Sequence, residues 1–149
     1  MNYRKLMLPS LIVIVASLFT GFGVQEKQAV VARLLEDRAF ILQRAYYGEM
    51  DVDEAERQLY QVETQPLLRE DIAALRKTDY CDLDIIEKLE VGQLQPQMSM
   101  FENLSFEGRL TWYMQGLSGN YIYDGNYYIL LKSCSGKWKL SQFTSLEEQ

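Results

Sequence analysis

The sequence predicts an α+β protein, with an N-terminal transmembrane helix followed by about three helices packed on one face of a bent antiparallel sheet of four to five strands. Three observations lead to this prediction. The chain begins with a long uncharged run, its apolar residues then follow helical spacing as far as about residue 78, and after that they alternate as they do in strands. Helices segregated to one face of a sheet let such a chain cover both apolar surfaces.

The uncharged run occupies residues 6–24, which contain no Asp, Glu, Lys or Arg. As a helix it reaches about 28 Å, close to the hydrocarbon thickness of a bilayer. Arg4 and Lys5 precede it, so the positive-inside rule predicts a cytoplasmic N-terminus at residues 1–5 and an extracytoplasmic domain at residues 25–145. We therefore expect a single-pass signal anchor in the cytoplasmic membrane.

A cleaved signal peptide is the alternative, and it would leave the domain secreted. Gly21-Phe22-Gly23 is a poor match to the small-residue pattern of a cleavage site, which favours the uncleaved anchor. Gly21 and Gly23 also predict a bend or short linker after the span. At the other end of the chain, the polar residues 146–149 are expected to fray.

Three helices are expected after the span. The first begins near residue 26 and ends near Gly48, a natural C-terminal stop, and its apolar residues recur at steps of three and four. Asp51 is placed to cap the second helix, with Glu54 placed to bond back to it. Pro66 opens the third helix, which continues to about residue 78.

Strands are expected from residue 80 onward. Residues 80–91 alternate apolar and polar side chains and end at Gly92, and residues 98–114 carry large apolar groups at even positions, with a break or bulge near Gly108. Two turn signals follow, Asp124-Gly125-Asn126 and Ser135-Gly136, and they separate runs rich in Tyr and Ile. Consecutive hairpins of this kind predict an antiparallel sheet.

Composition excludes several classes of function. The chain has no His, which removes the usual Ser-His and Cys-His catalytic pairs and the commonest zinc ligand. Without Arg4 and Lys5, 13 basic side chains stand against 21 acidic ones, which disfavours nucleic acid and anionic lipid headgroups as partners. There is no phosphate-binding loop, no Gly-x-Ser-x-Gly and no Cys-x-x-Cys. We expect no cofactor, no metal and no catalytic residue.

The two cysteines, Cys81 and Cys134, leave two alternatives open. Outside the cytoplasm they can form a disulfide, which would close a loop of about 50 residues and add roughly 4 kcal/mol of stability. Alternatively, both are unpaired core thiols.

Ten tyrosines are the compositional oddity of the chain. Strand propensity alone is one explanation of them. Tyrosine is also enriched in protein interfaces, because its ring packs while its hydroxyl finds a partner or water. The sequence therefore predicts an interaction surface at Tyr121, Tyr123, Tyr127 and Tyr128.

The order of three helices, long strands and a closing strand Gly-Lys-Trp-Lys-Leu, from Gly136 to Leu140, resembles the NTF2-like or cystatin-like superfamily, as found in small membrane-anchored bacterial proteins of unknown function. The resemblance covers roughly residues 26–145. It implies a cone-shaped pocket between sheet and helices, which different members use as an active site, a ligand site or a plain core. Fold alone does not choose among these.

The predicted anchor and the lack of catalytic motifs together favour a membrane-anchored, extracytoplasmic domain that serves binding or assembly in the cell envelope. Its partners would be the membrane, through residues 6–24, and other envelope proteins. The alternative is a small-ligand-binding or isomerase-like pocket domain. Side chains of the types found in an isomerase-like pocket are present, though none can be assigned a catalytic role: Tyr46, Tyr47, Tyr113, Tyr123 and Tyr128, with Asp82 or Asp84.

Overall fold

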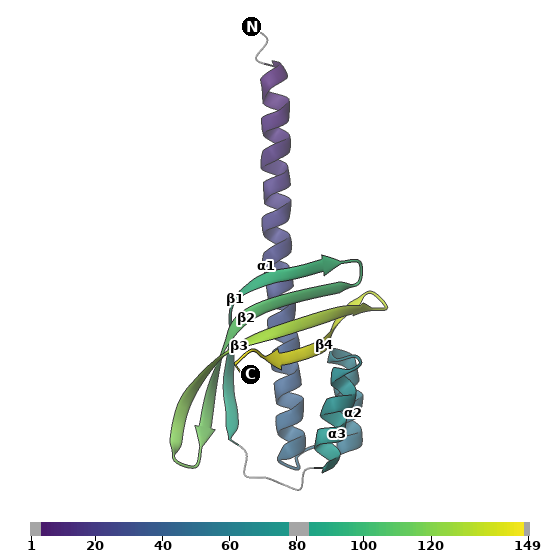
Figure 1. The fold of residues 1–149 in the computed structure, drawn as a ribbon, viewed down its shortest axis with the longest axis vertical. Coiled ribbons are helices and arrows are strands. Elements are labelled where there is room, and N and C mark those ends of the chain that lie inside the picture. The colour runs from purple at the N-terminus through teal and green to yellow at the C-terminus, as the bar shows by residue number, and fades with distance from the viewer. Residues whose placement is uncertain (1–3, 78–83, 148–149) are drawn as a thin grey trace. The chain divides into compact units, whose positions relative to one another are not determined.

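The computed structural model describes residues 4–77 and 84–147, with the backbone alone for residues 4–22 and 24. It contains three helices, α1 (Arg4–Tyr46), α2 (Val52–Val62) and α3 (Leu67–Lys77). Four strands follow, β1 (Ile85–Met100), β2 (Asn103–Gly116), β3 (Gly119–Cys134) and β4 (Lys137–Ser145) (Figure 1). The predicted α+β class is confirmed. The chain divides into two compact units, residues 1–31 and residues 32–149, which we describe separately.

The described part of the first unit is helical throughout, because α1 begins at Arg4. The chain is therefore helical at Gly21 and Gly23, and the predicted linker is wrong. Each glycine costs a helix only about 1 kcal/mol, which propagation on either side readily offsets. No helix among the described residues is long and apolar enough to cross a membrane. The side chains of the predicted span lie almost wholly outside that description, so the span stays a prediction.

The helices of the second unit begin where capping chemistry predicts. Asp51 caps α2, and its side chain accepts a hydrogen bond of 2.8 Å from the backbone N–H of Glu54. The Glu54 carboxylate accepts from Gln58 and Arg57 instead of bonding back to Asp51. Pro66 precedes α3, and its carbonyl accepts from the backbone N–H groups of the first turn.

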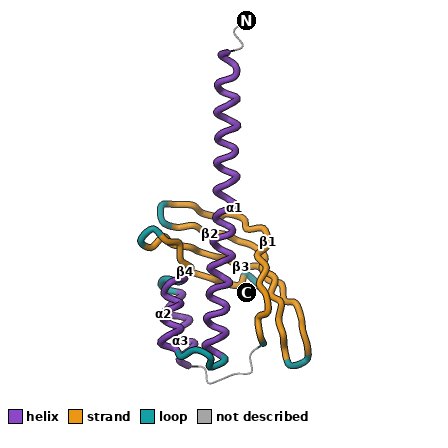
Figure 2. Tube along the Cα trace, turned by 180° about the vertical axis from the view of Figure 1, so that it is seen from behind, coloured by secondary structure: helices purple, strands orange, loops and turns teal. Residues whose placement is uncertain are grey.

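The sheet is a simple antiparallel meander in the order β1-β2-β3-β4. In the second unit the helices lie on one side of this bent sheet, as the two opposite views agree (Figures 1 and 2). The end of α2 is tied to the sheet at β4, where the N–H of Thr64 donates to the carbonyl of Leu140 at 2.7 Å. This contact closes one edge of the domain.

The predicted end of the first strand and the predicted start of the second strand are both wrong. β1 does not end at Gly92 but continues through Pro96 to Met100, with three shifts in its register against β2. An edge strand accommodates a proline and bulges, because its outer N–H groups need no partner. The turn that follows holds Phe101 and Glu102, which carry no turn signature, so sequence patterns missed it.

The predicted turn at Asp124-Gly125-Asn126 is also wrong, because these residues lie inside β3. The chain turns earlier, between Gly116 and Gly119. Gly125 serves packing: a Cβ there would lie 2.9 Å from Cε2 of Tyr127, so only glycine leaves room for that ring. The second turn signal, Ser135-Gly136, is confirmed between β3 and β4.

The core of the second unit lies between the helices and the sheet. It is formed by aliphatic side chains and two aromatic rings that are almost completely buried: Leu34, Leu35, Ala39, Ala55, Leu59, Val62, Leu67, Leu68, Ile72, Leu75, Leu89, Leu94, Leu104, Phe106, Leu110, Tyr127, Ile129, Leu131 and Leu140. Toward the β2–β3 turn the sheet extends past this core, and there a groove opens.

Candidate functional site

A groove of about 370 Å³ lies between the end of α1 and the concave face of the sheet. We call it the Trp112 groove. It is lined by side chains from α1, from the loop after it, and from β1, β2 and β3 with the residue before β1: Arg38, Ala39, Leu42, Gln43, Tyr46, Tyr47, Asp84, Ile86, Trp112, Met114 and Tyr121.

Simple periodicities bring these residues together. On α1, positions 38, 42 and 46 follow one another at steps of four and therefore share one face. In the sheet, Ile86, Met114 and Tyr121 are partners across β1, β2 and β3, and Trp112 lies two residues before Met114 on the same face. Because of these spacings, α1 and the sheet each present a mainly apolar surface to the groove.

The polar groups of the Trp112 groove are few and are oriented by hydrogen bonds. The hydroxyl of Tyr121 donates to Oδ2 of Asp84 at 2.5 Å, and this bond to a carboxylate raises the pKa of Tyr121. Oε1 of Gln43 accepts from the backbone N–H of Ile86 at 2.6 Å and so ties α1 to the first residues of β1. A carboxylate acceptor and a phenol donor therefore lie at the rim of an apolar groove.

An aromatic group supports the groove on its inner side. Nε1 of Trp112 donates to the Tyr127 hydroxyl at 3.2 Å, and the rings of Tyr127 and Phe143 are stacked with their centroids 4.7 Å apart. Trp112 meets both rings edge-on. The guanidinium of Arg38 lies 5.3 Å from the centroid of Phe143, a cation–π distance. These contacts fix the Trp112 ring in one orientation.

Behind this aromatic group lies a buried ionic cluster of Arg38, Glu63 and Asp71, which we call the Arg38 cluster. Nε of Arg38 bonds to Oε1 of Glu63 at 2.8 Å and to Oδ2 of Asp71 at 2.8 Å, while a terminal nitrogen bonds to Oδ1 of Asp71 at 2.8 Å. One cation thus serves two carboxylates.

Glu63 is the unusual member of the Arg38 cluster. Its side chain is 0% exposed, and its Oε2 has no hydrogen-bond partner among the described residues. Burial, together with the neighbouring charge and hydrogen bond of Asp71, raises the pKa of Glu63 to about 8, against the opposing effect of Arg38. Glu63 is therefore largely a neutral acid at pH 7.

Sequence reasoning missed the Arg38 cluster, although a signal was present. Arg38 follows Leu34 by four positions and precedes Leu42 by four, so it lies on the apolar stripe of its helix. Asp71 occupies the same kind of position between Leu68 and Leu75. A charge on a stripe that faces the core requires a partner there.

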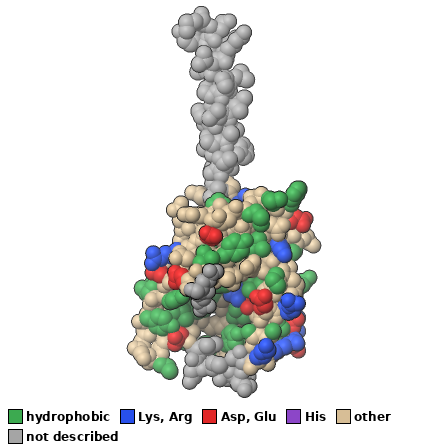
Figure 3. All heavy atoms as spheres, viewed as in Figure 1, with side chains coloured by type: hydrophobic (Ala, Val, Ile, Leu, Met, Phe, Trp, Pro, Cys, Tyr) green, Lys and Arg blue, Asp and Glu red, His purple; other side chains and the backbone are tan. Residues whose placement is uncertain are grey.

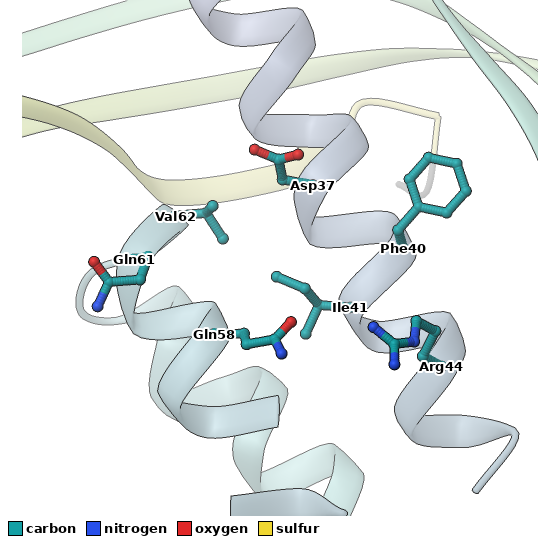
Figure 4. A pocket seen from close by; sticks show the side chains of 7 residues that line it. All are labelled: Asp37, Phe40, Ile41, Arg44, Gln58, Gln61 and Val62. Atoms are coloured by element: carbon teal, nitrogen blue, oxygen red, sulfur yellow. The ribbon is translucent and has the colours of Figure 1, made fainter. Parts of the chain in front are cut away.

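A second groove, of about 350 Å³, lies between α1 and α2. Figure 4 shows Ile41 of α1 and Gln58 of α2 pointing into the space between the helices, with Val62 above them. Its other lining residues are Asp37, Phe40, Arg44 and Gln61. Its lining includes one aromatic ring, whereas the Trp112 groove has four, which makes the latter the stronger candidate site.

The four tyrosines of the predicted interaction surface do not share one environment. Tyr121 lines the Trp112 groove, and Tyr123 lies two residues further along the same face of β3, opposite Trp112. Tyr127 is buried beneath them, whereas Tyr128 points to the other face of the sheet because strand side chains alternate. Of the isomerase-like candidates, Tyr46, Tyr47 and Asp84 meet in the groove.

The cysteines, Asp82 and the C-terminal tail, which the sequence analysis also singled out, lie away from the Trp112 groove or outside the described residues. Cys134 is half-buried at the end of β3, and Cys81 lies outside the described residues, so the disulfide stays a prediction. Asp82 also lies outside them. Leu146 and Glu147, at the start of the tail, both bond to Asn126. Among residues 4–77 and 84–147, no three metal-ligating side chains are grouped so as to hold an ion.

No family model and no curated protein matches the sequence. Several solved structures are similar. The intermembrane space region of the chloroplast protein ARC6 is 14% identical, with 77% of this chain and 95% of that chain covered and a TM-score of 0.47. An NTF-2 like protein of unknown function from Shewanella oneidensis MR-1 is 16% identical, with 78% and 96% covered and a TM-score of 0.48.

A hexachlorocyclohexane dehydrochlorinase, LinA type 2, is 12% identical, with 83% of this chain and 95% of that chain covered and a TM-score of 0.43. At these identities and TM-scores, the three similarities assign no family to this chain.

Proposed function

We propose that the second unit binds a small, mainly apolar molecule in the Trp112 groove, and that an anchor at residues 6–24 holds it outside the cytoplasmic membrane. The observation that carries the binding part is the groove itself. Its volume of about 370 Å³ falls in the range of small-molecule sites, and its lining is mostly apolar with a few oriented polar groups.

The polar groups suggest the chemistry of the ligand. Asp84 is an acceptor at the rim, and Tyr121 is a donor already engaged with it. Among the described residues, Arg38 is the one cation in the lining, and Glu63 and Asp71 already occupy its guanidinium. An anionic ligand would therefore meet a carboxylate without a cation to offset it. A neutral molecule with an apolar ring system and one hydroxyl fits best.

The membrane part of the proposal rests on the sequence. Residues 6–24 form an uncharged run long enough to span a bilayer, and the basic residues before it favour an N-terminus inside. Anchoring would confine the groove to a surface layer and raise its effective concentration toward molecules at that surface.

A fluorescent probe tests the binding site. We expect 2-naphthol, which joins an apolar ring system to one hydroxyl, to bind the wild-type protein with a change in its emission. Met114→Trp places a larger side chain in the groove and should weaken binding at least about tenfold, the equivalent of about 1.4 kcal/mol. Ile122→Trp is the matched control, because Ile122 is exposed on the opposite face of β3. Equal binding by the two folded variants would contradict the proposal.

Protein assembly is a second candidate function, favoured by a specific observation. Large apolar or aromatic side chains are exposed at the β2–β3 turn and on the concave face beside it: Leu117, Tyr121 and Tyr123. An exposed group of this kind on a soluble domain suggests a partner. The partner proposed here is another envelope protein.

In-cell photocrosslinking tests this second candidate. A photoreactive phenylalanine at position 123 should capture a specific partner, since Tyr123 is 47% exposed on the concave face. The same group at Tyr128, on the other face, should not. Capture of one identical set of proteins from both positions, or of none from either, would argue against assembly through this surface.

A further inference from the structure

The turn between β1 and β2 exposes large apolar side chains that contribute little to the core of the domain. Phe101 is 98% exposed and Met100 57%, and Met98 precedes them on the same strand. We call these three residues the β1–β2 tip. Phe101 also has a φ of 48°, a conformation that bulky residues rarely adopt and that glycine or asparagine would adopt at lower cost. Neither hydration nor backbone preference favours a phenylalanine here, so an external contact is the simplest reason for it.

The β1–β2 tip lies at the end of the sheet where the chain enters the second unit. The C-terminal end of α1 contacts the opposite end, because Gln43 bonds to Ile86 and Tyr46 lines the groove with Tyr121. Toward residue 32, the helix therefore runs along the sheet in the direction of the β1–β2 turn (Figures 1 and 2). Figure 3 shows hydrophobic side chains at the edge of the molecule where this turn lies.

Chain length limits how far this end can be from the proposed membrane span. Residues 25–31 separate the run at residues 6–24 from the second unit. These seven residues belong to α1 and reach about 10 Å as a helix. With residues 6–24 in the bilayer, as proposed, the entry point of the chain would lie close to its surface.

Two basic residues lie near the tip, which is compatible with a membrane surface. Lys132 of β3 lies opposite Asn103, the first residue of β2, in the strand register, and Lys137 begins β4 after the neighbouring turn. Glu102 is the acidic residue in the tip's own turn, and its backbone carbonyl accepts from Ser133 at 2.8 Å. The domain as a whole is acidic, so binding here would depend on apolar insertion and not on attraction to anionic headgroups.

We infer that the β1–β2 tip docks on the outer leaflet of the membrane, with Phe101 and Met100 at the boundary between headgroups and acyl chains. This inference rests on the proposed anchor at residues 6–24. Docking gives the domain a defined orientation. The Trp112 groove, near the opposite end of the sheet, then opens away from the lipid, toward the water layer at the membrane surface.

Fluorescence of a single labelled site in the full chain tests this docking. Phe101→Cys, on a background of Cys81→Ser and Cys134→Ser, is labelled with the dye NBD and reconstituted in phosphatidylcholine vesicles. We expect blue-shifted emission and strong quenching by lipids that carry a nitroxide near the headgroup. Leu117→Cys is the matched control, because Leu117 is 93% exposed in a turn at the other end of the sheet. Its label should be quenched several-fold less.

The outcomes separate this docking from the proposed function. Protein that does not float with the vesicles refutes the anchor and the docking together. Protein that floats, but whose labels at 101 and 117 are quenched equally, refutes the docking alone. A blue shift at 101 without lipid quenching means that protein covers the tip, which also overturns it. Met100→Cys gives a second labelling site at the tip with the same expectation, and circular dichroism checks the fold of every variant.

Discussion

Arg38→Met is expected to destabilise the protein by about 3–5 kcal/mol, the usual cost of removing one partner from a buried ion pair. The substitution leaves the carboxyl groups of Glu63 and Asp71 close together without their shared cation. It also removes the guanidinium from the face of Phe143. Urea unfolding of the full chain in mild detergent, followed by tryptophan fluorescence, measures the loss.

Arg57→Met is the control for the loss of an arginine charge. Arg57 pairs with Glu54 on the exposed surface of α2, where such a pair contributes no more than about 1 kcal/mol. Equal and small losses of stability in both variants would show that the Arg38 cluster contributes no more than an ordinary surface ion pair, which would contradict this prediction.

Glu63 is expected to make the stability of the protein fall as the pH rises from about 4.5 to about 8. The carboxyl has an ordinary pKa of 4.5 in the unfolded chain and a pKa of about 8 in the folded domain, because it is buried beside Asp71. The folded state therefore holds the proton more tightly, and its extra stability is complete below the lower value and lost above the higher one. The loss is on the order of 3 kcal/mol, because each pKa unit corresponds to about 1.4 kcal/mol and relaxation of a charged carboxylate offsets part of the full difference.

Glu63→Gln tests this pH dependence directly. Glutamine is neutral at every pH and has nearly the same size and shape as the protonated acid. We expect the variant to match the wild type near pH 5 and to be more stable near pH 9, as measured by urea unfolding at both values. The assignment of a neutral Glu63 would be contradicted if the stability of the wild type stayed constant or rose between pH 5 and pH 9 and the variant showed the same pH dependence.

Local patterns predicted the parts of the fold that neighbouring residues decide. The cap at Asp51, the start of α3 after Pro66 and the turn at Ser135-Gly136 each depend on a few adjacent residues, and the structure agrees with all three. The turn prediction at Gly125 failed because that glycine makes room for the Tyr127 ring, a contact made only in the folded sheet. The turn at Phe101 was missed because its residues carry no turn preference.

The candidate residues chosen from the sequence and the residues that line the groove overlap only in part. The sequence named Tyr46, Tyr47, Asp84 and Tyr121 among its candidates, and the structure brings them to one groove. It grouped Tyr127 and Tyr128 with them, although adjacent residues of a strand point to opposite faces and Tyr127 is buried. Trp112, at the centre of the groove, was counted only as part of an apolar strand.

By itself, the sequence determined the α+β class, the order of three helices before an antiparallel sheet, and the absence of histidine chemistry. These follow from periodicity and composition, which act over a few residues or over the whole chain. Only the tertiary structure decided that Arg38, Glu63 and Asp71 meet, and that the groove opens near the β2–β3 turn. The contacts of the Arg38 cluster join residues 25 to 33 positions apart, and those of the groove join residues 37 to 43 positions apart. They depend on how the helices pack against the sheet, which no local pattern encodes.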